Sequence, residues 1–182
     1  MRLWLLPVVL VACGPSSSTG TGGSGGGGGS GSGGAGGGSG TCNSAAKTPP
    51  NLVGNDGFEC GEMGWFAQTG DLAVATDART GAKALKLTAV SAGGKLASTQ
   101  PFVASTSGKT YCAVAYFKGT VADAQLMVRE AKTGGVVDHT FSTPVASTAW
   151  LRAPPSTNLE VRAAQGSKLY VLFVMHNSPA AG

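Results

Sequence analysis

The sequence predicts an all-β domain, built as a two-sheet jelly-roll sandwich. Turn signals recur at intervals of about 8 to 15 residues, from Gly54-Asn55-Asp56-Gly57 through Gly93-Gly94 to Gln165-Gly166. Between them, apolar and polar residues alternate in short runs, as on a strand with one buried face. No window of helical length carries an apolar stripe, so two packed sheets are the simplest way to bury these faces.

Each expected strand follows from its own pattern. Period-two alternation marks four strands, at residues 83–90, 111–117, 125–129 and 159–163. In the second of these, Tyr111, Ala113, Ala115 and Phe117 share one face. Residues 169–175 are apolar on both faces, which predicts a central strand that is buried on both faces.

Glycine content divides the chain of 182 residues. Of its 30 glycines, 16 lie between Gly14 and Gly40. We expect residues 13–50 to be a disordered Gly/Ser-rich linker, because they contain too little apolar surface to order themselves. Residues 51–182 form the expected β-sandwich, which is long enough for one hydrophobic core and excludes a multidomain enzyme.

The N-terminus resembles an export signal. Residues 1–12 combine one positive charge with a short apolar run, and Cys13 follows directly. The segment ending at Cys13 resembles the lipobox of bacterial lipoproteins, in which the cysteine is lipidated after cleavage. We therefore expect residues 1–12 to be a lipoprotein signal peptide and Cys13 to carry the membrane anchor, in the outer membrane or at the cell surface. The alternative is an ordinary cleaved signal with an incidental cysteine.

Charge and motif content exclude several functions. The formal net charge is +4, and basic residues are interspersed with acidic ones, so we expect no nucleic-acid partner. The two histidines, His139 and His176, have no metal-ligand spacing, and no serine lies in a credible nucleophile elbow. We therefore expect no catalytic activity.

Several segments resemble, in order, the CenC-like carbohydrate-binding modules. They are Asn51-Leu52-Val53-Gly54-Asn55-Asp56-Gly57-Phe58-Glu59, Gly64-Trp65, Arg79-Thr80-Gly81-Ala82-Lys83-Ala84-Leu85-Lys86-Leu87, Gly108-Lys109-Thr110-Tyr111-Cys112-Ala113-Val114-Ala115-Tyr116-Phe117-Lys118 and Ser147-Thr148-Ala149-Trp150. The resemblance implies a galactose-binding-like jelly roll that binds a polysaccharide or other glycan and holds a structural calcium ion.

The resemblance also implies the site residues. Tyr116 corresponds to an aromatic residue on the concave face, and Gln125 and Arg129 would share that face. Trp65 and Trp150 are further candidates for ligand contact. For calcium, the resemblance points to Glu59 and the turn at Gly81, whereas Glu59 could instead cap backbone N–H groups.

Two features depart from this family. Its modules close with a last strand carrying an acidic pair, and nothing after Met175 matches that strand, so we expect the sandwich to lack it. With Cys13 lipidated, Cys42, Cys60 and Cys112 remain, an odd number in an exported chain. A Cys60–Cys112 disulfide is our first expectation, and Cys42–Cys60 the next.

The sequence therefore predicts non-catalytic glycan binding by a lipid-anchored protein of the cell envelope. The alternative is a surface adhesion or structural module that uses the same fold to bind a protein. The oligomeric state and the identity of the glycan are left open.

Overall fold

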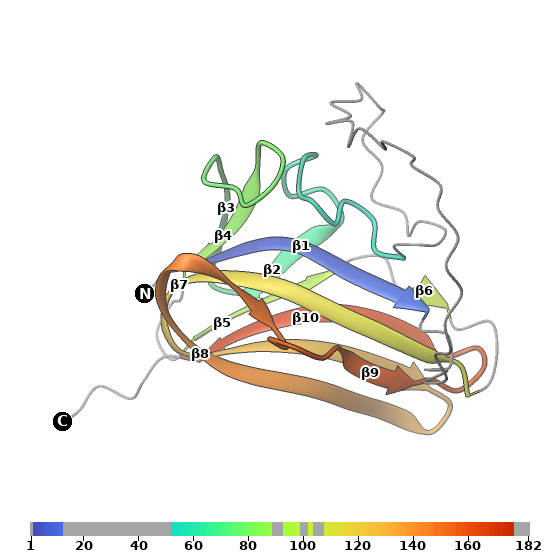
Figure 1. Ribbon diagram of the computed structural model, residues 1–182. Helices are drawn as coiled ribbons and strands as arrows, with labels where there is room; N and C mark the ends of the chain where they lie inside the picture. The colour runs from blue at the N-terminus through green and yellow to red at the C-terminus, as the bar shows by residue number, and fades with distance from the viewer. Residues whose placement is uncertain (1, 13–51, 89–92, 99–101, 104–107, 177–182) are drawn as a thin grey trace, which may run out of the picture.

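The computed structural model describes residues 2–12, 52–88, 93–98, 102–103 and 108–176. This part of the chain is all β, and every strand pairing is antiparallel (Figure 1). The strands are β1 (Arg2–Ala12), β2 (Trp65–Thr69), β3 (Asp71–Ala75), β4 (Ala84–Thr88), β5 (Gly93–Ser98), β6 (Phe102–Val103), β7 (Thr110–Lys132), β8 (Gly135–Ala153), β9 (Leu159–Arg162) and β10 (Lys168–His176). The predicted all-β class is confirmed, whereas the two-sheet sandwich and its jelly-roll topology stay predictions.

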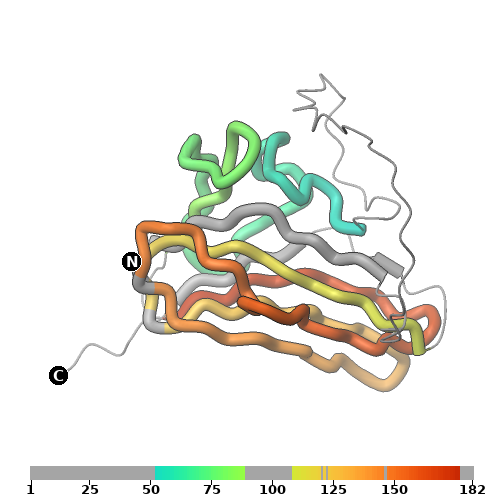
Figure 2. The backbone as a smooth tube through the Cα atoms, viewed as in Figure 1, coloured from blue at the N-terminus to red at the C-terminus, as the bar shows by residue number. Residues whose placement is uncertain are grey.

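The long hairpin of β7 and β8 connects the two halves of the strand network. The strand order is β2-β5-β10-β7-β1-β4-β3, and β8 and β9 pair with β7 off this path. The register between β7 and β8 shifts between Val121 and Ala124, where both strands turn back (Figure 2). Residues 111–119 of β7 consequently pair with β1, whereas residues 123–131 pair with β10.

The core lies between these two halves. Phe117, from the first half of β7, meets Phe173 of β10 edge to face, with ring centroids 5.8 Å apart. Both side chains are fully buried, as are Leu126 and Val128 of the second half of β7. The expected alternation along 111–117 and 125–129 is therefore confirmed: one side of each run faces the core, and the other faces outward.

The expected central strand is β10. It pairs with β5 on one side and with β7 on the other. Its inward residues Val171 and Phe173 are buried, and so is Leu172, which faces outward. Burial on both faces explains why the sequence of this strand does not alternate.

An asparagine organises the loop that precedes β2. The Asn55 side chain, 5% exposed, donates to the carbonyl oxygens of Gly61 at 2.9 Å and Met63 at 2.8 Å, and accepts a hydrogen bond from the Cys60 N–H at 3.0 Å. These bonds satisfy backbone groups for which the loop offers no backbone partner. They hold the loop at the start of β2, where Trp65 enters the core.

Two features differ from the expectations. Gly93-Gly94, expected to form a turn, begins β5, because these residues pair with Met175 and His176. The segment Arg2–Ala12 forms β1 and lies between β4 and β7, while its expected role as an export signal stays a prediction. Among the described residues, no helix is long and apolar enough to cross a membrane.

Candidate glycan-binding face

The outward side of the second half of the fold forms a face made by five strands. One row across it runs from Phe66 of β2 through Ala97 of β5, Leu172 of β10 and Met127 of β7 to Thr140 of β8. The next two rows are Val174-Gln125-Ser142 and Tyr170-Arg129-Asp138. We call the side chains of Phe66, Tyr170, Leu172, Val174, Gln125, Met127, Arg129, Asp138, Thr140 and Ser142 the platform.

Cross-strand pairs position the polar groups of the platform. Arg129 donates to Asp138 through two parallel bonds, Nε to Oδ1 and Nη2 to Oδ2, each 2.7 Å long. These bonds raise the pKa of the Arg129 guanidinium above its ordinary value, although burial opposes them. Gln125 Nε2 donates to Ser142 Oγ at 2.8 Å. Donors and acceptors are thus held at fixed positions before a ligand arrives. Binding therefore costs less side-chain conformational entropy.

Apolar side chains lie between the two polar pairs. Met127 and Leu172 form a small cluster against which Tyr170 and Val174 pack. Phe66, in the same row, is 42% exposed. Met127 and Leu172 are 8% and 1% exposed, so the apolar surface that a sugar ring could contact belongs to Phe66 and to the half-buried Tyr170 and Val174.

A second outward face surrounds Tyr116. The Arg79 guanidinium lies 3.9 Å from the centroid of the Tyr116 ring. Lys118 Nζ lies 2.6 Å from Asp77 Oδ2 and 5.8 Å from the Trp150 ring. Because Arg79 occupies one face of the Tyr116 ring, a sugar would have to displace that guanidinium or use the other face.

The structure separates the candidate ligand residues into two groups. Tyr116 and Trp150 lie on the outward side of the first half of the fold, whereas Gln125 and Arg129 lie on the outward side of the second. The two inward sides pack on each other through the core, so the two outward sides face away from each other. The expectation that Tyr116 shares one face with Gln125 and Arg129 is therefore wrong, because β7 turns back between them.

Trp65 lies in the core. It is 4% exposed, and its ring centroid lies 5.3 Å from Phe58 and 5.7 Å from Phe173. Its indole N–H donates to the Asn55 carbonyl oxygen at 3.2 Å. Trp65 therefore presents no ring face to a ligand, and its neighbour Phe66 is the exposed aromatic residue of β2.

Sequence reasoning missed Asp138, Ser142, Tyr170 and Phe66. One signal could have located the first two. Thr133-Gly134 is a two-residue connection, so β7 and β8 pair from Lys132 with Gly135 onward. Counting back along that register places Arg129 opposite Asp138 and Gln125 opposite Ser142.

Glu59 caps the turn before β4. Its Oε1 accepts hydrogen bonds from the N–H groups of Ala82 at 2.9 Å and Lys83 at 3.2 Å. Gly81, at a φ of +75°, passes so close that a Cβ atom there would lie 2.1 Å from this oxygen. The described residues contain no group of three or more His, Cys, Asp or Glu side chains that could hold a metal ion, and calcium binding by Glu59 and Gly81 stays a prediction.

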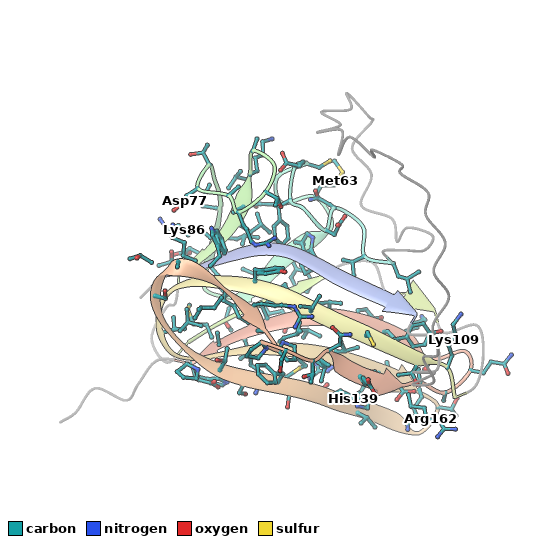
Figure 3. The ribbon with its side chains drawn as sticks, in the orientation of Figure 1. Met63, Asp77, Lys86, Lys109, His139 and Arg162 are labelled. Carbon is teal, nitrogen blue, oxygen red and sulfur yellow. The ribbon has the colours of Figure 1, made fainter. Side chains whose placement is uncertain are left out.

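A buried carboxylate, that of Glu130, belongs to the second half of β7. Glu130, 2% exposed, accepts a hydrogen bond from the Ala164 N–H at 2.7 Å. Burial raises the pKa of Glu130, but hydrogen bonds from Ala164 and Ser167, with Lys132 and His139 nearby, hold that pKa below its ordinary value. His139 Nε2 lies 3.6 Å from Glu130 Oε2 and has no hydrogen-bond partner in this part of the chain. Figure 3 shows His139 at the opposite end of the fold from Asp77 and Lys86.

Cys60 and Cys112 are both disulfide-bonded. Their pairing with each other stays a prediction, and so does lipidation of Cys13, which lies outside the described residues.

Comparisons with known proteins give a structural neighbour and no family. No protein-family model matches the chain, and no curated protein matches its sequence. The fold is similar to a crystal structure of the enzymatically active domain of tailspike protein 4 of bacteriophage CBA120, with a TM-score of 0.54 at 13% sequence identity. The match covers 70% of this chain but 19% of the tailspike chain. At this identity the likeness shows a shared β-rich fold.

Proposed function

We propose that this protein binds a polysaccharide or other glycan without catalysis, through the platform. The observation that carries the proposal is the bidentate Arg129–Asp138 pair, which lies beside the half-buried Tyr170. A vicinal diol both donates and accepts hydrogen bonds, and this pair presents N–H donors and carboxylate oxygens side by side. Both side chains are about one-third exposed, at 30% and 33%, so a ligand can reach them.

The wider setting is also a proposal. The ordered sequence segments support a CenC-like carbohydrate-binding module. The apolar segment before Cys13 supports a lipid anchor, which would hold the module at the cell envelope. A structural calcium ion at Glu59 would stabilise the turn at Gly81, as the resemblance implies. A non-catalytic role is favoured because Asp138 already accepts two hydrogen bonds from Arg129 and is therefore a positioned acceptor rather than a free base.

The test is retention of the full chain on insoluble and arrayed neutral polysaccharides. Arg129→Lys keeps the charge but removes the two-pronged geometry, so we expect the affinity to fall about five- to tenfold. Arg162→Lys is the matched control. Arg162 is exposed on β9, which pairs with residues 110–113 of β7 and not with the platform residues of that strand, so the affinity of this variant should equal that of the wild type. Melting curves of both variants should lie near the wild type, because an ion pair that is one-third exposed contributes little to stability and Arg162 is an exposed side chain.

A second candidate function is favoured by the free side of β8. In the first half of this strand, Val136 is 61% exposed and Val137 is 38% exposed, and among the described strands β8 pairs with β7 alone. An open strand edge with apolar residues can pair with another protein. A wild-type chain that melts cooperatively yet binds no polysaccharide would favour this adhesion role over glycan binding.

A further inference from the structure

Four basic side chains gather at one end of the fold, although they are far apart in the sequence. β7 turns back midway along its length, so its first and last residues lie at the same end (Figure 2). β9 ends there and β10 begins there, because residues 110 and 131 of β7 pair with Arg162 and Lys168. We call the basic side chains at or next to these four strand ends the basic end: Lys109, Lys132, Arg162 and Lys168. Figure 3 shows Lys109 and Arg162 at this end, away from Asp77 and Lys86.

Acidic side chains do not neutralise the basic end. All four of its side chains are exposed, and within the segments that the structure describes none of them forms an ion pair. All nine Asp and Glu residues of the sequence lie in those segments. Of the acidic residues on the strands that meet here, Glu130 lies near Lys132 but is 2% exposed, and Asp138 is bonded to Arg129. Glu160 of β9 is exposed, so four exposed cations stand against one exposed carboxylate, and such a surface attracts anions.

Exposed apolar side chains lie beside these cations. Just after the turn of the β7–β8 hairpin, Val136 is 61% exposed and Val137 is 38% exposed. A Cβ atom placed on Gly134 or Gly135 of the hairpin, or on Gly166 of the β9–β10 loop, would have no atom within 4 Å. The tips of this hairpin and this loop therefore project into open space, with the cations around them.

We propose that the basic end binds a membrane surface that carries anionic lipid headgroups. Lysine and arginine side chains bind the headgroup phosphates, and apolar side chains next to them enter the boundary of the acyl region. An acidic polysaccharide in solution would also attract the four cations, but it offers no hydrocarbon layer to Val136 and Val137. The combination of cations with projecting valines therefore favours the membrane.

This contact would add to the lipid anchor proposed at Cys13. A single acyl chain holds a protein on a membrane only weakly, and a basic patch is a common second contact. The platform lies on one side of the strands and not at their ends, so it would stay accessible while the basic end is bound. The inference rests on the proposed location at the cell envelope, but its test does not require lipidation.

The test is co-sedimentation of the full chain with vesicles of phosphatidylglycerol and phosphatidylcholine, and with vesicles of phosphatidylcholine alone. Every protein carries Cys13→Ser, so that no attached lipid contributes. Residues 1–12 are common to all variants, so differences between variants report on the basic end. Each basic residue near an anionic surface strengthens binding about fivefold, so Lys132→Gln combined with Lys168→Gln should lower the affinity for the anionic vesicles at least about tenfold.

The matched control is Lys86→Gln combined with Lys118→Gln, which removes the same net charge. Both residues lie opposite Trp4, and Lys118 lies about 25 Å along β7 from Thr110. That distance exceeds the screening length of about 10 Å at 0.1 M salt, so the affinity of this variant should stay within about twofold of the wild type. Melting curves check that both double variants are folded.

Two further measurements separate the charges from the valines. Val136→Thr keeps the branched shape but replaces a methyl group with a hydroxyl group, which should lower the affinity about threefold. Raising the salt concentration to about 1 M shortens the screening length to about 3 Å and should release most of the wild-type chain from the vesicles.

Three results would overturn the proposal. They are equal binding of anionic and neutral vesicles by the wild-type chain, wild-type affinity in the K132Q/K168Q variant, and equal losses in the two double variants, which would mean that only net charge matters. Binding of soluble polygalacturonate, lost in K132Q/K168Q and accompanied by no binding of vesicles, would assign the basic end to an acidic glycan instead. Arg129 and Asp138 are intact in all these variants, so failure of glycan binding by the platform would leave the results unchanged.

Discussion

Trp65 and Phe66 are adjacent aromatic residues for which the structure predicts opposite behaviour. Trp65 is 4% exposed, whereas Phe66 is 42% exposed on the platform. Replacing a buried aromatic residue with alanine costs about 3 to 5 kcal/mol, since apolar burial is lost and a cavity is left. Trp65→Ala also breaks the contacts with Phe58 and Phe173 and leaves the buried Asn55 carbonyl oxygen without its indole donor.

We therefore expect Trp65→Ala to lower the free energy of unfolding by about 4 kcal/mol, a large part of the stability of a domain this size. At about 3 to 5 °C per kcal/mol, this corresponds to a fall in Tm of about 12 to 20 °C. Phe66→Ala should cost less than about 1 kcal/mol but lower the affinity for a glycan about three- to tenfold. Calorimetry or circular dichroism gives the first quantity, and polysaccharide retention gives the second.

The pair is its own control, because the two substitutions differ by one position on the same strand. A Trp65→Ala variant that melts like the wild type would refute the assignment of Trp65 to the core. Equal loss of Tm in both variants would refute the alternation of β2. Undiminished glycan affinity in Phe66→Ala would remove that residue from the platform.

Three further results are expected. Gly81→Ala should destabilise more than Gly134→Ala as measured by urea unfolding, because both glycines have positive φ but only at Gly81 would the new Cβ collide with Glu59; equal losses would show that the collision is relieved. Because the folded-state pKa of Glu130 is lowered, its stabilisation is present at neutral pH and is lost as the pH falls below about 4. Glu130→Gln should lower the free energy of unfolding by about 1 to 3 kcal/mol at pH 7 and make it fall less steeply in acid. An unchanged dependence of this free energy on pH would exclude Glu130 as the source of the acid destabilisation. In a double-mutant cycle, Arg129→Ala and Asp138→Ala should show a coupling of about 0.5 to 1 kcal/mol, and a coupling of zero would mean that the pair is absent in solution.

Local patterns in the sequence determined the fold class and the inward residues. Alternation requires only that one face of a strand be buried, so 111–117, 125–129 and 169–175 could be assigned without knowing their partners. The same patterns could not show whether Trp65 or Phe66 faces inward, because both residues are large and apolar. The Gly93-Gly94 pair was misread for a similar reason: glycine permits a turn but does not prevent pairing with β10.

Tertiary structure decided which outward residues share a face. Tyr116 and Gln125 are nine positions apart, so alternation along a straight strand would place them on opposite faces of the sheet. The register shift between Val121 and Ala124 turns both residues outward, but in different halves of the fold. The platform is an assembly of five strands whose neighbours are far apart in sequence, and only the register of the sheet brings Phe66, Tyr170 and Arg129 together. The place of β1 was equally hidden, since an apolar run has the same composition whether it is a signal or a strand. Its role depends on the two edges, β4 and β7, that lie beside it.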